Sequence, residues 1–94
     1  MDTPYQPLLS QREHSKRRLL ARLYALNSEG LQPTKYRLVG RVPGSTRTLK
    51  YKMITALIDL GLAVNRGSPG RYALDITALG KAELRYWTVK EGPQ

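Results

Sequence analysis

With 94 residues, the chain is long enough for one domain and too short for two. Sixteen Lys and Arg against seven Asp and Glu give a net charge of +9, which favours a polyanionic partner without distinguishing DNA, RNA or an anionic membrane surface. The chain has no Cys, which excludes disulfides and thiolate metal sites, and no apolar run approaches the roughly 20 residues of a membrane span. We therefore expect a cytoplasmic, nucleoid-associated protein without membrane contact.

The N-terminal part is predicted to be an irregular arm followed by a helix. Residues 1–9 contain two prolines and should lack regular structure, with Leu8 and Leu9 able to fold onto the body. Ser10 and Glu13 match a capping box, which predicts a helix from about residue 11 to 27. Its expected apolar stripe comprises Leu19, Leu20, Leu23, Tyr24 and Leu26. Its basic side chains, which are either a solvated face or contacts to phosphates, are Lys16, Arg17, Arg18 and Arg22.

A short second helix is expected after the turn at residues 27–30. Leu31 is placed to make a single strand bridge, and Pro33 or Thr34 should open a helix that reaches about Arg41. The side chains expected to pack this helix are Tyr36, Val39 and Val42. The Pro-Gly pair that follows should end it, because proline disfavours a helical residue before it. Two helices joined by so short a turn must cross steeply, which is the helix-turn-helix arrangement.

The third helix, expected from about residue 46 to 60, is the segment on which the predicted function depends. Ser45 or Thr46 is the expected N-cap, and Gly61 should close the helix in a left-handed conformation. At about 100° per residue, one apolar arc is expected to face the core. It consists of Leu49, Met53, Ile54, Ala56, Leu57 and Leu60. The exposed N-terminal half then presents basic and hydroxyl side chains, the chemistry that a DNA major groove accepts.

Period-two alternation on both sides of the Gly-Ser-Pro-Gly turn at residues 67–70 predicts an antiparallel hairpin. The alternating apolar residues are Leu62, Val64, Tyr72 and Leu74. Arg66 and Arg71 flank the tip of this hairpin, and no carboxylate is expected beside them. Two guanidinium groups held close together repel each other, and a phosphate would relieve that repulsion. The alternative is that both side chains extend into water.

Thr77 is expected to start a last helix from residue 78 to about 89, with apolar residues on two sides. The side expected to close the core comprises Leu79, Ala82, Tyr86 and Val89. Leu84 and Trp87 would then be exposed, and an exposed apolar patch is typical of an association surface. We therefore predict a homodimer through this helix, with or without the first helix. The alternative is a wide core that uses both sides.

Three stretches, LIDLGLAVNR, GSPGRYALD and ITALGKAEL, resemble the corresponding parts of winged-helix transcriptional regulators of the MarR and PadR kind. In that family an apolar recognition helix ends at Gly-Leu, a hairpin with an Arg near its tip follows, and the next helix starts at Leu-Thr-x-x-Gly; this chain has Ile76 in place of that leucine. The resemblance implies a winged helix-turn-helix fold that is α+β, mainly α, with a three-helix core, a two-stranded wing and a C-terminal helix. This domain would cover residues 10–90, between the arm at 1–9 and a tail at 91–94. The matching positions imply base reading by Thr46, Arg47, Thr48, Tyr51 and Lys52 and wing contacts by Arg66 and Arg71.

These features together predict sequence-specific binding of double-stranded DNA by a small transcriptional regulator, most simply a repressor. The third helix would lie in the major groove, residues 66–71 would reach the backbone or the minor groove, and Lys35, Arg37 and Arg41 would hold phosphates. The predicted DNA contacts are Lys35, Arg37, Ser45, Thr46, Arg47, Thr48, Lys50, Tyr51, Lys52, Arg66 and Arg71, and the predicted dimer contacts are Leu84 and Trp87. Two alternatives stay open: an architectural or replication DNA-binding protein, and a winged-helix protein-interaction module.

Enzymatic chemistry has little support in the sequence. The only histidine, His14, belongs to no serine or carboxylate constellation of recognised spacing, and the seven acids are scattered. The turn at residues 67–70 lies inside a hairpin rather than before a helix, so it does not match a phosphate-binding loop. We therefore expect no catalysis, no metal, no cofactor and no small-molecule effector.

Overall fold

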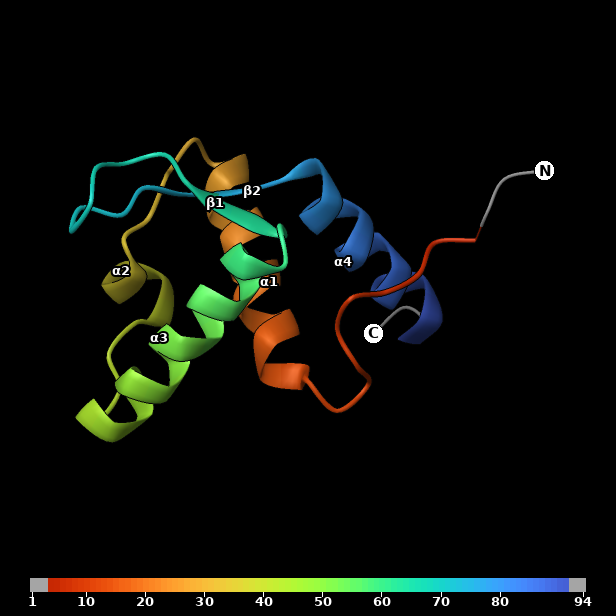
Figure 1. Ribbon diagram of the computed structural model, residues 1–94, viewed down its shortest axis with the longest axis horizontal. Coiled ribbons are helices and arrows are strands. Elements are labelled where there is room, and N and C mark those ends of the chain that lie inside the picture. Colours follow the sequence, from red (N-terminus) through yellow and green to blue (C-terminus); the bar gives the residue numbers. More distant parts are fainter. Residues whose placement is uncertain (1–3, 92–94) are drawn as a thin grey trace.

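The computed structural model describes residues 4–91, and within them the chain is α+β and mainly helical, as predicted (Figure 1). Four α-helices and one antiparallel two-stranded sheet make up this part of the chain. The elements are α1 (His14–Ser28), α2 (Lys35–Val39), α3 (Gly44–Asp59), β1 (Ala63–Asn65), β2 (Leu74–Ile76) and α4 (Ala78–Glu91). The helix α1 is central and packs against α2, α3, α4 and β2, so that α2 and α3 lie on one side of it and α4 on the other (Figure 1).

The hydrophobic core surrounds α1. Leu19, Leu20 and Leu23 of this helix are buried, as predicted, whereas Tyr24 is 46% exposed, so the apolar stripe is narrower than the sequence pattern indicated. The other buried apolar side chains of the core are Leu9, Leu38, Ile54, Leu57, Leu62, Ala63, Leu74 and Ile76. Full burial of a leucine or isoleucine contributes about 1.5–3 kcal/mol relative to exposure. Through Leu9, the N-terminal arm is therefore part of the core.

The helix α1 begins at His14 rather than at the predicted residue 11. Glu13 is its N-cap residue and makes no side-chain cap. The Glu13 carboxylate accepts hydrogen bonds from Ser10 N (2.9 Å) and Lys16 Nζ (2.6 Å), so the carboxylate half of the predicted capping box forms before the helix starts. The hydrogen bond from Lys16 is the main reason why the pKa of Glu13 lies below its ordinary value.

The second helix starts as predicted and ends earlier. Thr34 caps it, because its Oγ1 accepts a hydrogen bond from Arg37 N (3.1 Å). Gly40 then adopts a φ of 82° and donates from its N to Tyr36 O (2.9 Å), which stops α2 before the predicted end at residue 41. Leu38, at 1% exposure, fills the core, whereas Tyr36 is 53% exposed, which corrects its expected packing role.

The strands β1 and β2 form an antiparallel hairpin, as predicted, but the second strand begins only at Leu74, so Tyr72 lies in the loop and not in the strand where it was expected. Their facing pairs are Ala63 with Ile76, Val64 with Asp75 and Asn65 with Leu74. Asn65 organises the loop at residues 66–73, because its Oδ1 accepts hydrogen bonds from Gly67 N and Ala73 N, both at 2.9 Å. A Cβ on Gly67 would collide with the carbonyl oxygen of Arg71, so this loop conformation requires glycine there.

Asn27 joins the end of α1 to the hairpin. Its Nδ2 donates to Leu31 O (2.8 Å) and Leu74 O (3.1 Å), and its Oδ1 accepts from Ile76 N (2.7 Å). The backbone N of Leu74 donates to Pro33 O (2.9 Å). The strand bridge predicted at Leu31 is therefore wrong, because Pro33 makes the backbone contact to the hairpin instead.

The helix α3 begins at Gly44, so Ser45 and Thr46 lie inside the helix. The prediction that one of them is the N-cap is therefore wrong. The N-cap residue is Pro43, with extended backbone angles (φ −58°, ψ 153°) and no side-chain cap. Pro43 O accepts a hydrogen bond from Arg47 N (2.9 Å), and this bond closes the first turn before either predicted cap residue.

The core face of α3 is rotated from the centre of the predicted arc toward Ile54 and Leu57, by roughly 70° at 100° per residue. Its buried residues are Ile54 and Leu57, whereas Leu49 is 56% and Leu60 is 38% exposed. Leu49 lies in the N-terminal half of α3, whose first turns extend beyond α1 and α2 (Figure 1). Gly61 follows the helix with a φ of 79°, the left-handed conformation that the sequence predicted.

The helix α4 turns a different side inward from the one predicted. It begins after Thr77, as expected, and the Thr77 hydroxyl accepts a hydrogen bond from Gly80 N (2.9 Å). A Cβ on Gly80 would collide with the carbonyl oxygen of Leu62, so only glycine permits this close packing. The buried residues of α4 are Gly80, Glu83 and Trp87. Of the side expected to close the core, Leu79 is 41% and Val89 77% exposed, and Ala82 and Tyr86 are half-buried, so none of these four residues is fully inside.

Trp87 is inside the molecule, which corrects the expectation that it and Leu84 form an exposed patch. The indole is 7% exposed, donates to Glu83 Oε2 (2.8 Å) and has the Arg17 Cζ 4.2 Å from its ring centroid. Leu84 is half-buried against the core. Arg17 also pairs with Glu91 (3.0 Å), so this buried arginine is neither solvated nor available to a phosphate.

Glu83 holds the irregular N-terminal arm against α4. Its carboxylate accepts hydrogen bonds from Tyr5 Oη (2.5 Å), Leu8 N (2.9 Å), Leu9 N (3.0 Å) and Trp87 Nε1 (2.8 Å). Burial acts to raise the pKa of Glu83, but the four hydrogen bonds together hold this pKa below its ordinary value. Burial, together with the hydrogen bond to Glu83, raises the pKa of Tyr5. The arm from Tyr5 to Leu9 is thus fixed by one carboxylate.

Candidate nucleic-acid interface

Lys35 brings α2, α3 and the hairpin loop together. Its Nζ donates to Thr55 Oγ1 on α3 (3.2 Å) and lies 4.4 Å from the ring centroid of Tyr72 in the loop. The ring of Tyr51 on α3 is also near, at 5.8 Å. The three segments that the sequence predicts to contact DNA are therefore adjacent in the folded chain.

The outer face of α3 carries exposed hydroxyl and basic side chains. They are Ser45, Thr48, Lys52 and Thr55. Thr46 and Lys50, which are also predicted contacts, are half-buried. The hydroxyls of Thr48 and Thr55 donate to backbone carbonyls one turn earlier, at 3.1 and 3.2 Å. Thr48 therefore keeps its acceptor capacity toward solvent, whereas the Thr55 hydroxyl already accepts from Lys35. With the Lys52 ammonium, this face offers donors and acceptors suited to base edges and phosphates.

Arg47 and Tyr51 lie on the inner flank of α3 because the helix is rotated. Arg47 Nη2 donates to Val42 O (3.2 Å), and its Cζ lies 5.0 Å from the ring centroid of Tyr36. The Arg47 Nε is buried without a hydrogen-bond partner in the described part of the chain. A buried unpaired donor costs about 1–3 kcal/mol, so the side chain would gain by moving to an outside acceptor. To contact a base edge, Arg47 must leave Tyr36.

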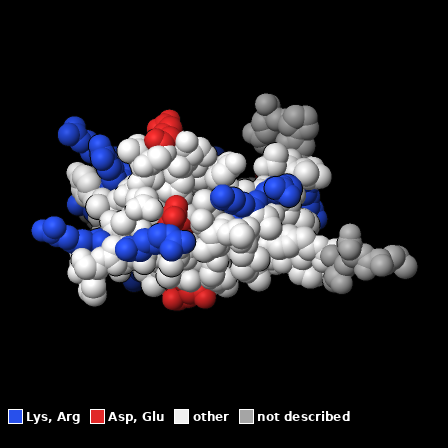
Figure 2. Space-filling view, turned by 90° about the horizontal axis from the view of Figure 1, so that it is seen from above, with Lys and Arg blue, Asp and Glu red and all other residues white. Residues whose placement is uncertain are grey.

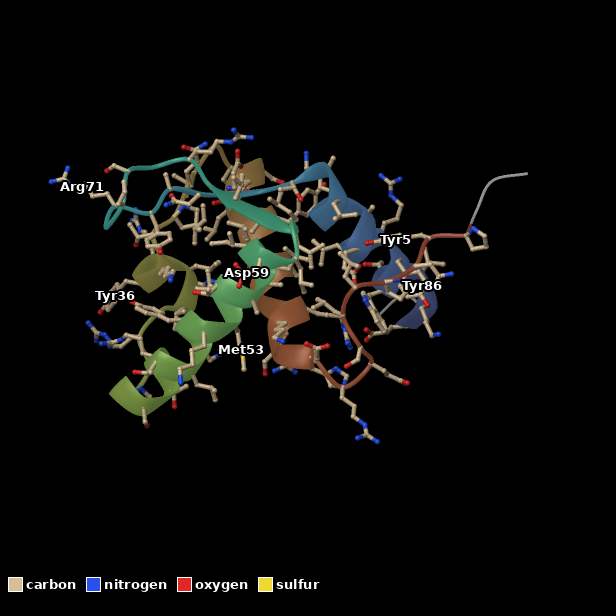
Figure 3. The ribbon with its side chains drawn as sticks, viewed as in Figure 1. Tyr5, Tyr36, Met53, Asp59, Arg71 and Tyr86 are labelled. Atoms are coloured by element: carbon tan, nitrogen blue, oxygen red, sulfur yellow. The ribbon has the colours of Figure 1, made fainter. Side chains whose placement is uncertain are left out.

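The hairpin loop carries one paired and one unpaired arginine. Arg66 Nε donates to Asp75 Oδ2 at 2.9 Å. The expectation that no carboxylate would lie beside the tip arginines is therefore wrong for Arg66, because the antiparallel register sets Val64 against Asp75 and brings this acid across the hairpin. Arg71 makes no ion pair within residues 4–91, and Figure 3 shows it projecting from the end of the loop.

Positive charge on this side of the molecule is not compensated within residues 4–91. The ion pairs of that part are Lys16 with Glu13, Arg17 with Glu91 and Arg66 with Asp75. The basic residues of α2, α3, their connection and the loop tip that make no such pair are Lys35, Arg37, Arg41, Arg47, Lys50, Lys52 and Arg71. Figure 2 shows Lys and Arg projecting from the end of the molecule that carries the hairpin loop. Such an excess attracts a polyanion.

The described residues contain no candidate metal site and no membrane-spanning helix. Among residues 4–91, no three His, Cys, Asp or Glu side chains lie close enough together to hold a metal ion. The helices of this part are too short or too polar to cross a membrane. His14 stands at the start of α1, with its Nδ1 2.8 Å from Arg17 Nη2.

Three contacts that shape the interface have no local signal in the sequence. They are Lys35 with Tyr72, Arg47 with Tyr36 and Arg66 with Asp75. Each pair joins two different elements, and alternation of basic and aromatic residues within α2 and α3 is equally compatible with a solvated surface. Only the tertiary arrangement shows which cations contact an aromatic ring and which are paired with a carboxylate.

Comparison with protein-family models, with curated proteins and with solved structures gives no match to this chain. The function is therefore inferred from the charge, exposure and contacts of the chain's own residues.

Proposed function

We propose that this protein binds double-stranded DNA as a small winged helix-turn-helix regulator of transcription, with α3 as its recognition helix and the hairpin as its wing. One observation carries the proposal: α2, α3 and the hairpin tip bear basic side chains that make no ion pair within residues 4–91. These segments are adjacent, because Lys35 of α2 contacts Thr55 of α3 and Tyr72 of the loop. The element order supports it, because two closely joined helices followed by a hairpin and a helix is the order implied by the resemblance to MarR and PadR regulators.

Each segment has a distinct role in this proposal. The outer face of α3 enters the major groove, with Thr48 and Lys52 at base edges. Lys35 and Arg37 of α2 contact flanking phosphates, which set the register without reading sequence. Arg71 at the hairpin tip reaches further phosphates or the minor groove, whose narrow A·T-rich form attracts guanidinium groups.

The two predicted dimer contacts, Leu84 and Trp87, do not form an exposed patch. Trp87 is buried and Leu84 is half-buried, so the exposed patch that suggested a homodimer through α4 is not present. A homodimer stays a prediction, and it would bind half-sites about one helical turn apart. Light scattering of the protein on the selected duplex measures the number of chains directly.

Selection of bound duplexes from a random-sequence pool tests the proposal. A regulator should enrich one sequence and bind it at least about 10³-fold more tightly than random DNA at physiological salt. Lys52→Ala and Thr48→Ala should each weaken binding to that sequence by about 1–3 kcal/mol and relax the preference at one base position. Lys90→Ala, at the exposed end of α4, is the matched control and should leave both affinities unchanged.

Two results would count against a sequence-reading regulator. Equal affinity for enriched and random duplexes, with strong salt dependence, would indicate an architectural DNA-binding protein. No binding to any duplex at low salt would remove DNA as the partner and would favour a protein-interaction module.

A further inference from the structure

The outer side of α4 forms an apolar surface that the proposed DNA interface does not use. A hollow of about 330 Å³ lies between α1 and α4, and its lining includes Tyr24, Leu84 and Val89. A second hollow, of about 380 Å³, lies between α4 and the N-terminal arm, with Tyr5 and Val89 in its lining. Val89 is 77% exposed and borders both hollows, so it forms a ridge between them.

Basic side chains border these hollows. Lys81 and Arg85 are exposed and line the first hollow, and Arg85 also lines the second. Neither makes an ion pair within residues 4–91. The acids of α4 cannot neutralise them, because Glu83 is buried under four donors and Glu91 is paired with Arg17. Figure 2 shows a second group of basic side chains over the α4 side of the molecule.

We propose that this surface binds an amphipathic helix of a partner protein whose polar face is acidic. Apolar side chains three and four residues apart would enter the hollows on either side of Val89, as in other helix-in-groove complexes. Asp or Glu on the flanks of that helix would pair with Lys81 and Arg85. Between Lys81 and Val89, α4 rises about 12 Å at 1.5 Å per residue, which matches roughly two turns of a bound helix.

A second copy of the chain fits this surface less well. A twofold contact through the hollow would set Lys81 and Arg85 of one copy near the same residues of the other. Within residues 4–91, the acids that are neither paired nor buried are Glu29 and Asp59, which lie on other parts of the molecule. Nucleic acid would satisfy the cations but supplies no aliphatic side chain for the hollows. Because α4 lies across α1 from α2 and α3, a partner helix and DNA would bind at the same time (Figure 1).

Titration with a designed peptide tests this inference. The probe is a labelled helical peptide of about 18 residues with Leu at positions i, i+3, i+4 and i+7 and Glu at most others. Amide chemical shifts of the full chain should change at Tyr24, Leu84 and Val89 and stay constant in α3. Lys81→Glu with Arg85→Glu should weaken peptide binding at least about tenfold and should favour the same peptide with Lys in place of Glu.

A variant of equal charge provides the control. Arg37→Glu with Lys52→Glu changes the net charge by the same amount on the opposite side of α1, so it should lose DNA while it keeps the peptide. The α4 double variant should keep its preference among DNA sequences, so the inference about α4 and the proposed DNA function can fail separately. Val89→Asp should abolish peptide binding. The variant should still fold, because the Val89 side chain is 77% exposed.

Four outcomes would overturn the partner-helix inference. They are no binding of the acidic peptide, equal weakening by both double variants, shift changes confined to α3 and the hairpin, and a dimer in the absence of peptide whose contacts map to α1 and α4. The second would indicate general charge attraction, the third binding at the DNA interface, and the last a second copy as the occupant.

Discussion

Glu83 and Arg47 are buried or half-buried charged residues in opposite situations. The Glu83 carboxylate is surrounded by donors from the arm and from Trp87 in α4. Arg47 keeps one buried Nε without a partner in the described residues. A fully hydrogen-bonded buried charge rigidifies its surroundings, whereas a partly satisfied one favours rearrangement. We therefore expect Glu83 to act in stability and Arg47 to change its contacts when DNA binds.

Replacing the Glu83 carboxylate by an amide should destabilise the fold. Glu83→Gln should lower the free energy of unfolding by about 1–3 kcal/mol, because the amide NH₂ would face a donor and leave it unsatisfied. Urea denaturation followed by Trp87 fluorescence measures this change. Glu29→Gln, at an exposed position, should change stability by less than about 0.5 kcal/mol. Equal effects of the two substitutions would contradict the role assigned to Glu83.

Stability should also fall in acid through Glu83. Its folded-state pKa lies below the ordinary value, so the ionised carboxylate stabilises the fold above its unfolded-state pKa. Below about pH 4.3, the ordinary pKa of glutamate, this stabilisation is lost progressively as the pH falls through the folded-state pKa. Unfolding free energies of the wild type and of Glu83→Gln should therefore converge toward low pH, and a constant difference between them across this range would exclude the mechanism.

At the scale of elements, α3 and α4 form where predicted but present other sides to the core. In α3, Ile54 and Leu57 are buried, whereas the Leu49 side chain is 56% exposed. Leu49 lies in the N-terminal half of α3, whose first turns extend beyond the neighbouring helices. In α4, the close approach of Gly80 to Leu62 turns Val89 outward. Both helices carry apolar residues on more than one side, so periodicity alone gave more than one possible orientation.

Two glycine substitutions test how α4 is oriented. Glycine inside a helix normally costs about 1 kcal/mol relative to alanine, but Gly80→Ala should destabilise the protein by about 1–3 kcal/mol because its Cβ would meet the Leu62 carbonyl. Gly44→Ala, with nothing within 4 Å of its Cβ, should be neutral or stabilising by up to about 1 kcal/mol. Thermal unfolding of both variants measures the contrast, and a stabilising Gly80→Ala would show that α4 packs differently.

At the scale of the whole molecule, basic side chains without an ion pair within residues 4–91 lie on both sides of α1, and α1 itself carries the exposed Arg18 and Arg22. The unpaired cations of α2, α3 and the hairpin tip lie on one side of α1, and Lys81 and Arg85 lie on the outer side of α4. At physiological salt, exposed charges more than about 8 Å apart are largely screened from each other.

The salt dependence of DNA affinity should separate these two surfaces. Arg37→Ala should reduce the slope of log K against log salt by about one, equally on selected and random duplexes, because each phosphate contact releases about one counterion. Lys81→Ala should leave the slope unchanged. Fluorescence anisotropy at several salt concentrations measures both slopes, and equal reductions would mean that the whole basic surface contacts DNA.

Much of the fold followed from local signals. Thr34 and Thr77 cap helices where expected, Gly61 ends α3, and the turn at residues 67–70 joins two antiparallel strands. Each of these depends on residues a few positions apart, which a single sequence displays directly. For the candidate site, the sequence predicted which segments carry the basic residues but not that Arg66 is paired.

The sequence by itself determined the order and type of the elements and the excess of positive charge, because capping, turn chemistry and composition are local properties. Only the tertiary structure decided that Trp87 and Arg17 lie inside, that Asp75 neutralises Arg66 and that Glu83 holds the N-terminal arm. These contacts join residues far apart in the chain or on different elements. They depend on how far each helix rotates about its axis, and that rotation is set by close contacts between elements rather than by the pattern within one.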